Sequence, residues 1–162
     1  MKLTSLFIVL LISLSGYAQT TIIHCGNLFD AEKGEVKGTS TLIINADTIT
    51  SVENGIVTPK MKDAQVIDLK DYTVLPGLID FHVHIESETN PNKYLERYQL
   101  TDADVAFNSQ ALAKTTLMAG FTTVRDVGGR GVNIALRDAI DKGKVIGPRI
   151  FTSGKALATT GG

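Results

Sequence analysis

The apolar run at residues 74–81 constrains this chain most, because it leads directly into a pair of histidines, His82 and His84. A Pro-Gly pair, Pro76-Gly77, breaks this run, and the strand is expected to begin directly after it, at Leu78. A nearly continuous apolar strand of this kind is typical of parallel sheets that are covered on both faces. Side chains two residues apart on a strand point to the same face. The sequence therefore predicts that both imidazoles project side by side from the end of a buried strand.

These two histidines are candidate metal ligands, although a His-x-His pattern alone is common and more often has no such role. Asp80, His82 and His84 are expected to share one face, and polar side chains on a buried strand need partners. Imidazoles about 6.5 Å apart along a strand can converge on one ion with bonds near about 2.1 Å. We therefore predict His82 and His84 as metal ligands, with Asp80 supporting them from outside the coordination sphere.

Beyond His84, helical and strand patterns alternate. Residues 86–100 are polar and predict a long loop, and Thr101 with Asp104 forms the pattern of a capping box that opens a helix ending at Gly120. Three further elements are expected, namely a strand at residues 121–126, a helix at about 132–142 and a strand at 150–153. This alternation is typical of parallel α/β structure, and a (β/α)8 barrel fits it, with its active site at the C-terminal ends of the strands.

The part of the chain that precedes this strand has a β pattern. Short β-branched or alternating runs, separated by turn-rich pieces, predict strands at residues 21–24, 41–44, 48–52 and 65–69. His24 is interpreted as a surface or hydrogen-bonded residue. Cys25 is the only cysteine, so an internal disulfide is excluded, and we interpret it as a small buried side chain.

Residues 1–18 are predicted to be an export signal. They carry Lys2, a short apolar core and small residues ending at Ala18, and an uncleaved anchor is the alternative. The apolar stretch is too short for stable membrane insertion, so we expect a periplasmic or extracellular protein. The net charge is −1, which argues against a nucleic-acid partner or a polybasic membrane partner.

Three segments are similar to motifs of a known family. Leu-Pro-Gly-Leu-Ile-Asp-Phe-His-Val-His (residues 75–84) resembles the first barrel strand of the metal-dependent amidohydrolase superfamily. Ala-Gly-Phe-Thr-Thr-Val-Arg-Asp (119–126) resembles the second strand, and Gly-Pro-Arg-Ile-Phe-Thr-Ser-Gly (147–154) the third. Together they are most similar to the imidazolonepropionase-like branch, which includes Xaa-Pro dipeptidase relatives. The resemblance covers roughly residues 21–162.

The resemblance implies an α/β fold with two domains after the export signal. Residues 19–75 would be the N-terminal part of a composite β-sandwich, and residues 76–162 the first three or so strands of a (β/α)8 TIM-type barrel. In the family, later strands supply a carboxylated lysine, two more histidines and an aspartate that acts as general base. No histidine follows His84 here. We therefore expect an incomplete N-terminal fragment of a longer enzyme, inactive alone.

Arg125 is a candidate for substrate binding, because it lies where the second strand meets its loop. Its guanidinium is suited to a substrate carboxylate, and the backbone N–H groups of Gly128 and Gly129 are suited to an anion. The alternative is an internal ion pair between Arg125 and Asp126, followed by an ordinary flexible turn.

The sequence favours a metal-dependent amidohydrolase that hydrolyses a C–N bond of an amide, a cyclic amide or a dipeptide with a metal-activated water. Its cofactor would be one or two divalent ions, with zinc as the default and manganese, cobalt or iron left open. Two other hypotheses stay open: a metal-dependent deaminase on the same barrel, and a secreted, non-catalytic binding module. The expected partner is a small-molecule or dipeptide substrate, and the oligomeric state is not determined by the sequence.

Overall fold

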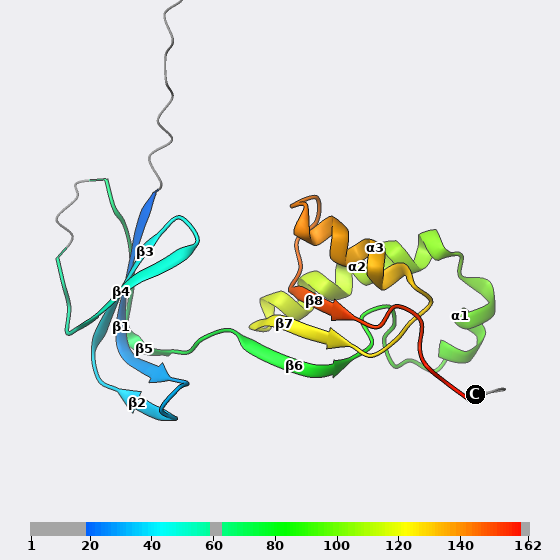
Figure 1. Ribbon diagram of the computed structural model, residues 1–162, viewed down its shortest axis with the longest axis horizontal. Helices are drawn as coiled ribbons and strands as arrows, with labels where there is room; N and C mark the ends of the chain where they lie inside the picture. The colour runs from blue at the N-terminus through cyan, green and yellow to red at the C-terminus, as the bar shows by residue number, and fades with distance from the viewer. Residues whose placement is uncertain (1–18, 59–62, 160–162) are drawn as a thin grey trace, which may run out of the picture. The chain divides into compact units, whose positions relative to one another are not determined.

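The computed structural model describes residues 19–58 and 63–159, and the predicted export signal lies outside the described residues. The chain forms two compact units, which divide between Pro76 and Gly77 (Figure 1). Among the helices in the described ranges, none is long and apolar enough to cross a bilayer.

The first unit is a five-stranded sheet built around its longest strand, β1 (Thr20–Asp30). The first part of β1 pairs antiparallel with β3 (Ser40–Asn45), and its last residues pair with β2 (Glu35–Lys37). β5 (Gln65–Val74) runs parallel to β1, and β4 (Thr48–Asn54) pairs antiparallel with β3. The four predicted strands are confirmed, while β2 forms within a stretch that the sequence predicted as turn-rich.

The two β1 residues singled out from the sequence are both buried in this unit. The Cys25 side chain is fully buried and packs with Leu28 and Leu42. His24 is also buried, and its Nε2 lies 3.1 Å from the carbonyl oxygen of Val57. The interpretations of Cys25 as a small buried side chain and of His24 as a hydrogen-bonded residue are therefore confirmed.

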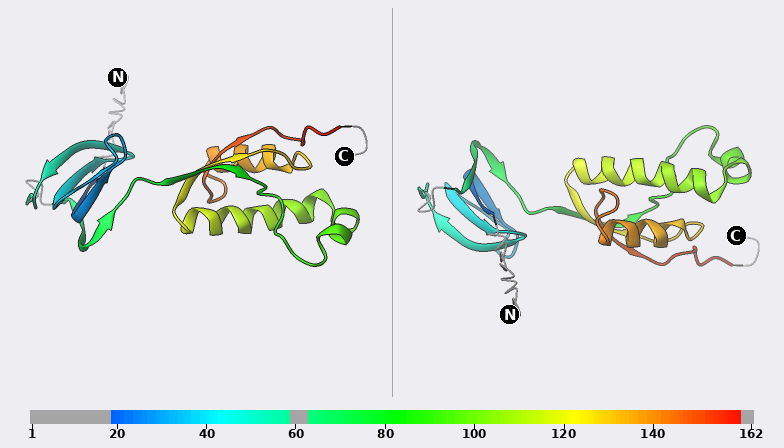
Figure 2. Two further views of the ribbon diagram at one scale, coloured as in Figure 1. Left: turned by 90° about the horizontal axis from the view of Figure 1, so that it is seen from below. Right: turned by 90° about the horizontal axis from the view of Figure 1, so that it is seen from above.

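The second unit is a three-stranded parallel sheet in the order β6 (Leu78–Val83), β7 (Phe121–Asp126), β8 (Arg149–Thr152). Two crossover helices connect the strands, α2 (Asp102–Met118) and α3 (Val132–Asp141). They lie side by side next to the sheet (Figure 2). The predicted order of strands and helices is confirmed, and the chain has a mixed α/β structure.

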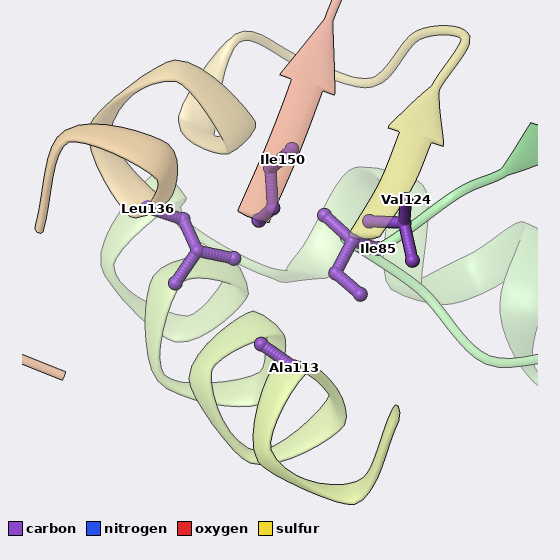
Figure 3. Close-up of a cluster of buried hydrophobic side chains, with 5 residues drawn as sticks. All are labelled: Ile85, Ala113, Val124, Leu136 and Ile150. Carbon is purple, nitrogen blue, oxygen red and sulfur yellow. The ribbon is translucent and has the colours of Figure 1, made fainter. Parts of the chain in front are cut away.

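A hydrophobic core joins the three strands of this unit to the two helices. Figure 3 shows its buried members pointing toward one another from both layers: Ile85, Ala113, Val124, Leu136 and Ile150. Burial of one large aliphatic side chain contributes about 1.5–3 kcal/mol, so this cluster is the main attraction between sheet and helices.

The predicted capping box opens α2. Thr101 Oγ1 accepts a hydrogen bond from the Asp104 backbone N–H at 3.3 Å, and the Asp104 carboxylate accepts one from the Thr101 N–H at 2.9 Å. The hydrogen bonds from Thr101, first from its hydroxyl and then from its amide, hold the pKa of Asp104 below its usual value. The chain leaves the helix at Gly120, whose φ of +97° suits glycine.

The prediction of a continuous loop at residues 86–100 is wrong, because α1 (Lys93–Gln99) forms within it. Side chains just before the helix order this turn. Asn90 accepts a hydrogen bond from the Asn92 N–H at 2.8 Å and donates one to the Glu96 carboxylate at 3.0 Å. Such local bonds decide whether one short turn of helix forms, and they have no periodic signature in the sequence.

The prediction that β6 is buried on both faces is also wrong. Leu78, Ile79 and Phe81 are 45%, 53% and 65% exposed. The physical reason is that β6 is an edge strand within the described part of the chain, and pairs there with β7 alone. The core beneath the helices reaches only the end of the strand, at Val83 and Ile85.

Candidate metal centre

The two predicted metal ligands lie next to each other at the C-terminal end of β6. His82 is the last residue but one of β6, and His84 directly follows the strand. Both side chains are exposed. Their ring centroids are 5.5 Å apart, and the ring planes meet at 72°. The structure therefore brings together two imidazoles at the edge of the sheet where a parallel α/β fold carries its site.

The ring of His84 is held by one backbone hydrogen bond. Its Nδ1 lies 2.9 Å from the carbonyl oxygen of Gly128. A carbonyl only accepts, so the neutral ring carries its proton on Nδ1 and its lone pair on Nε2. Histidines that bind metals usually donate their second ring N–H to a carbonyl or carboxylate in this way. His84 is thus prepared to bind a metal through Nε2, and the residues present fit that role.

Asp80 supports the strand backbone rather than an imidazole ring. Its Oδ1 accepts a hydrogen bond from the backbone N–H of His82 at 2.9 Å. The pairing of β6 with β7 shifts between Asp80 and Val83, which is an irregularity of the β-bulge kind. The simple two-residue alternation assumed for Asp80, His82 and His84 is therefore interrupted within the strand.

The Gly128 carbonyl owes its position to a glycine-specific backbone. Gly128 has φ of +143°, and a Cβ there would lie 2.5 Å from the Cα of Ala156. Its own N–H donates to Asp126 Oδ1 at 2.8 Å. Gly128, which accepts the hydrogen bond from His84, is thus fixed on one side by its packing against Ala156 and on the other by the Asp126 carboxylate.

Asp126 is the centre of a buried polar network and is 1% exposed. Its Oδ2 accepts from the Ile85 N–H at 2.9 Å, and its Oδ1 accepts from the Gly128 N–H at 2.8 Å and from Asn133 Nδ2 at 3.1 Å. Asn133 Nδ2 also donates to the Gly154 carbonyl at 2.9 Å. This carboxylate therefore connects the segments that follow β6 and β7 to α3.

A second carboxylate, that of Glu86, occupies the N-terminus of α3. It accepts hydrogen bonds from the backbone N–H groups of Arg130, Gly131 and Asn133, the last at 2.7 Å. Unsatisfied N–H groups at a helix N-terminus favour negative charge. The N-cap residue of α3 is Gly131, which has no side chain to accept from these groups, and the Glu86 carboxylate caps the helix instead.

The predicted anion site on Gly128 and Gly129 is wrong, because both amides are already engaged. The Gly128 N–H donates to Asp126, and the Gly129 N–H donates to the Gly154 carbonyl at 2.9 Å. Since an N–H group donates one good hydrogen bond, neither amide is left for a substrate anion.

Arg125 projects from β7 toward the strand that carries the histidines. Its Nε donates to the carbonyl of Phe81, the residue before His82, at 2.9 Å. Its side chain is exposed while that of Asp126 is buried, and no ion pair joins them within the described ranges. The alternative of an internal Arg–Asp pair is therefore wrong. An open hollow of about 290 Å³ lies beside Arg125 and is lined by Arg125, Asp126, Val127, Phe151, Thr152 and Ser153.

The residues described here provide a histidine pair and not a closed metal site. No group of three or more His, Cys, Asp or Glu side chains within residues 19–58 and 63–159 is arranged to hold a metal ion. A catalytic zinc ordinarily has three protein ligands and one open position. Two imidazoles are thus the contribution that this part of the chain makes to such a site.

Sequence reasoning missed the network around the histidines. Asp126 has a detectable signal, since it follows Val124 by two residues on the core-facing side of a strand, where a polar residue needs partners. Glu86, Asn133 and the Gly128 carbonyl have none, because their partners are set by the tertiary fold.

Comparison with known proteins assigns the chain to a class. The sequence profile of the amidohydrolase family matches residues 73–161, which is more than half of the chain. The chain therefore belongs to the amidohydrolase family, and the family predicted from its motifs is confirmed. Members of this family are typically metal-dependent hydrolases.

Among solved structures, the chain is 41% identical to a Xaa-Pro dipeptidase with methionine bound in its active site, with a TM-score of 0.81 over 89% of this chain and 35% of that one. It is 37% identical to a prolidase complexed with N-methylphosphonate-L-proline, with a TM-score of 0.76 over 89% of this chain and 34% of that one. An ochratoxinase from Aspergillus niger is 30% identical over 94% of this chain and 32% of the enzyme. The chain spans about a third of the length of these relatives.

Proposed function

We propose that the intact protein is a metal-dependent amidohydrolase that hydrolyses the C–N bond of an amide, a cyclic amide or a dipeptide, and that His82 and His84 bind its metal. The observation that carries this proposal is the hydrogen bond from His84 Nδ1 to the Gly128 carbonyl, beside a second exposed imidazole. A divalent ion, with zinc as the first choice, would supply a water with a pKa near about 7 and would polarise the scissile carbonyl.

In this proposal the described residues hold and orient the metal ligands. His82 and His84 bind, the Gly128 carbonyl keeps the lone pair of His84 on Nε2, and the Asp80 carboxylate holds the backbone at His82. β6, β7 and β8 would be the first three strands of a (β/α)8 barrel, with the histidines at its C-terminal face. The first unit would be the N-terminal part of a β-sandwich. The remaining ligands and the general base would come from outside the described residues.

Of the three substrate classes, we favour the dipeptide. One relative, 41% identical over the aligned part, is a Xaa-Pro dipeptidase with bound methionine, and another is a prolidase bound to a phosphonate derivative of proline. An amino acid carries a carboxylate, and a guanidinium is well matched to a carboxylate. Arg125, which lies across from the strand of the histidines, would bind the C-terminal carboxylate of the substrate.

The test is the metal content of histidine variants. The complete reading frame, established by sequencing genomic DNA across and beyond codon 162, is expressed as wild type, as His82→Ala and as His84→Ala. Bound metal is measured by mass spectrometry after dialysis, and hydrolysis of Xaa-Pro dipeptides is measured in parallel. We expect each variant to lose at least one equivalent of metal and to lose the hydrolysis of the dipeptide.

The control for this experiment is His24→Ala. His24 lies in the first unit, where its ring bonds to the Val57 carbonyl, and it is expected to keep the full metal content when it is replaced. Unchanged metal content in both His82→Ala and His84→Ala would contradict the proposed ligands.

A further inference from the structure

We propose that Asp126 and Asn133 are positioning residues for His84. They act by holding the Gly128 carbonyl where it accepts the hydrogen bond from His84 Nδ1–H. Their role in metal binding rests on the proposed function. The tautomer that they impose on His84 is a property of the metal-free protein and is measurable independently of any metal.

The first step of the argument is the pair of bonds made by Gly128. Its carbonyl accepts from His84 Nδ1 at 2.9 Å, and its N–H donates to Asp126 Oδ1 at 2.8 Å. The backbone of Gly128 has little freedom to move, because even a Cβ at this residue would collide with Ala156. The position of the Asp126 carboxylate is therefore transmitted to the carbonyl that selects the proton on the imidazole.

The second step is that Asp126 also holds the other side of His84. Its Oδ2 accepts from the N–H of Ile85, the residue directly after His84, at 2.9 Å. The Asp126 carboxylate thus fixes both the backbone next to His84 and Gly128, the residue that accepts the hydrogen bond from the ring. Because Asp126 is 1% exposed, water does not compete efficiently for these bonds.

The third step concerns Asn133, which is fully buried in the first turn of α3. Its Nδ2 donates both to Asp126 Oδ1 and to the Gly154 carbonyl, whereas its Oδ1 has no partner within the described part of the chain. A flipped amide would set its oxygen against two other oxygens, so the orientation is fixed. The side chain acts as a donor that holds the carboxylate in place.

The experiment uses Asp126→Asn in the protein expressed from the complete reading frame. Asparagine has the shape of aspartate, but it replaces one acceptor by an N–H donor, which would then face the N–H of Ile85 or of Gly128. Protein labelled with [15N]histidine is studied without metal by NMR, and the His84 signals are assigned by their loss in His84→Ala. Zinc affinity is measured in the same samples by competition with a chromophoric chelator.

In the wild type we expect a single tautomer of His84, with a protonated Nδ1 and an unprotonated Nε2. In Asp126→Asn we expect averaged nitrogen shifts from both tautomers and a loss of about 10–100-fold in zinc affinity, the range found when a partner of a metal ligand is removed. Unchanged shifts and unchanged affinity would overturn the proposal.

Glu86→Gln is the matched control. Glu86 is also a buried carboxylate, and it accepts hydrogen bonds from backbone N–H groups at the start of α3, but Gly128 is not among its partners. We expect this variant to keep the His84 tautomer and the zinc affinity. Equal effects of Glu86→Gln and Asp126→Asn would mean that both residues only maintain the fold, which would overturn the proposal.

Asn133→Ala serves where Asp126→Asn does not fold, because it keeps the carboxylate and removes one of its three donors. A smaller shift of the tautomer ratio in the same direction supports the proposal, and an unchanged ratio overturns it. A wild type that shows the tautomer but has the same zinc affinity as His84→Ala contradicts the proposed function and leaves the positioning role supported. The two failures are therefore distinguishable.

Discussion

Arg125 crosses from β7 to the carbonyl of Phe81 and so lies beside the strand that carries both histidines. That bond occupies the Nε–H, and a guanidinium has four further N–H donors on its two Nη atoms. A charge with this geometry is suited to a carboxylate that must be held in one orientation. At the scale of the residue, Arg125 thus accounts for substrate orientation in the proposed function, while the histidines account for metal binding.

Replacement of Arg125 by methionine is expected to reduce kcat/KM for Xaa-Pro dipeptides by roughly 10–100-fold, because a hydrogen bond to a charged group contributes about 1.5–3 kcal/mol. The loss should appear mainly in KM if the guanidinium binds substrate and transition state equally. The control is the same dipeptide with an amidated C-terminus, whose hydrolysis by wild type and variant should be alike. An equal loss with both substrates would argue against a carboxylate contact.

At the scale of the element, the start of α2 depends on a reciprocal pair of bonds between Thr101 and Asp104. The folded pKa of Asp104 lies below its ordinary value of 3.8, chiefly because of the hydrogen bond from the Thr101 hydroxyl. A carboxylate with a depressed folded pKa stabilises the protein fully above its unfolded pKa. It loses this contribution as the pH falls through the folded value.

We therefore expect Thr101→Ala to lower the free energy of unfolding at pH 7 by about 1 kcal/mol, the usual effect of removing an N-cap. Asp104→Ala should also destabilise at pH 7, and its effect should shrink as the pH falls below 3.8. Urea unfolding at several pH values measures both. In a Thr101→Ala background the pH-dependent part should become smaller, because only the Thr101 backbone N–H still bonds to the carboxylate, and an unchanged pH dependence would show that the hydroxyl does not lower this pKa.

At the scale of the whole molecule, the residues that follow the predicted export signal enter the fold at once. β1 begins at Thr20, and its first residues pair with both β3 and β5. We expect the exported protein to begin at Gln19, because a cleavage site after Ala18 leaves β1 complete. N-terminal sequencing of the protein from the periplasm or medium tests this. Ala18→Arg should block cleavage and keep residues 1–18 attached. A wild-type protein that stays in the cytoplasm and starts at Met1 would contradict the proposed export.

The order of strands and helices followed from sequence patterns because long elements carry a periodic signal. β7 has the bounds that were expected for it, residues 121–126, and the capping box begins α2 where Thr101 and Asp104 indicated. The short elements β2 and α1 escaped, since a few local bonds decide them. The exposure of β6 also escaped, because an apolar strand reveals its affinity for a core but not which neighbours cover it.

The candidate site was predictable only in part, for a related reason. His82 and His84 follow a strand pattern directly, so their proximity can be read from local spacing. The partner of the His84 ring is a backbone carbonyl 44 residues away, and a carbonyl has no identity in a sequence. The Asp126 carboxylate accepts from the amide of Ile85, 41 residues away, and the Glu86 carboxylate accepts from the amide of Asn133, 47 residues away. Such partners are known only when the crossover helices are placed.

The pairing of β6 also has a consequence for synthesis on the ribosome. Leu78 pairs with Phe121, so the partner strand emerges roughly forty residues later, which takes about 2–8 s at ~5–20 residues per second. Collapse of a chain of this size takes only about 10–100 μs. The nascent chain therefore presents Leu78, Ile79 and Phe81 without a partner strand for seconds. That interval is long enough for a chaperone to bind this apolar segment before β6 pairs with β7.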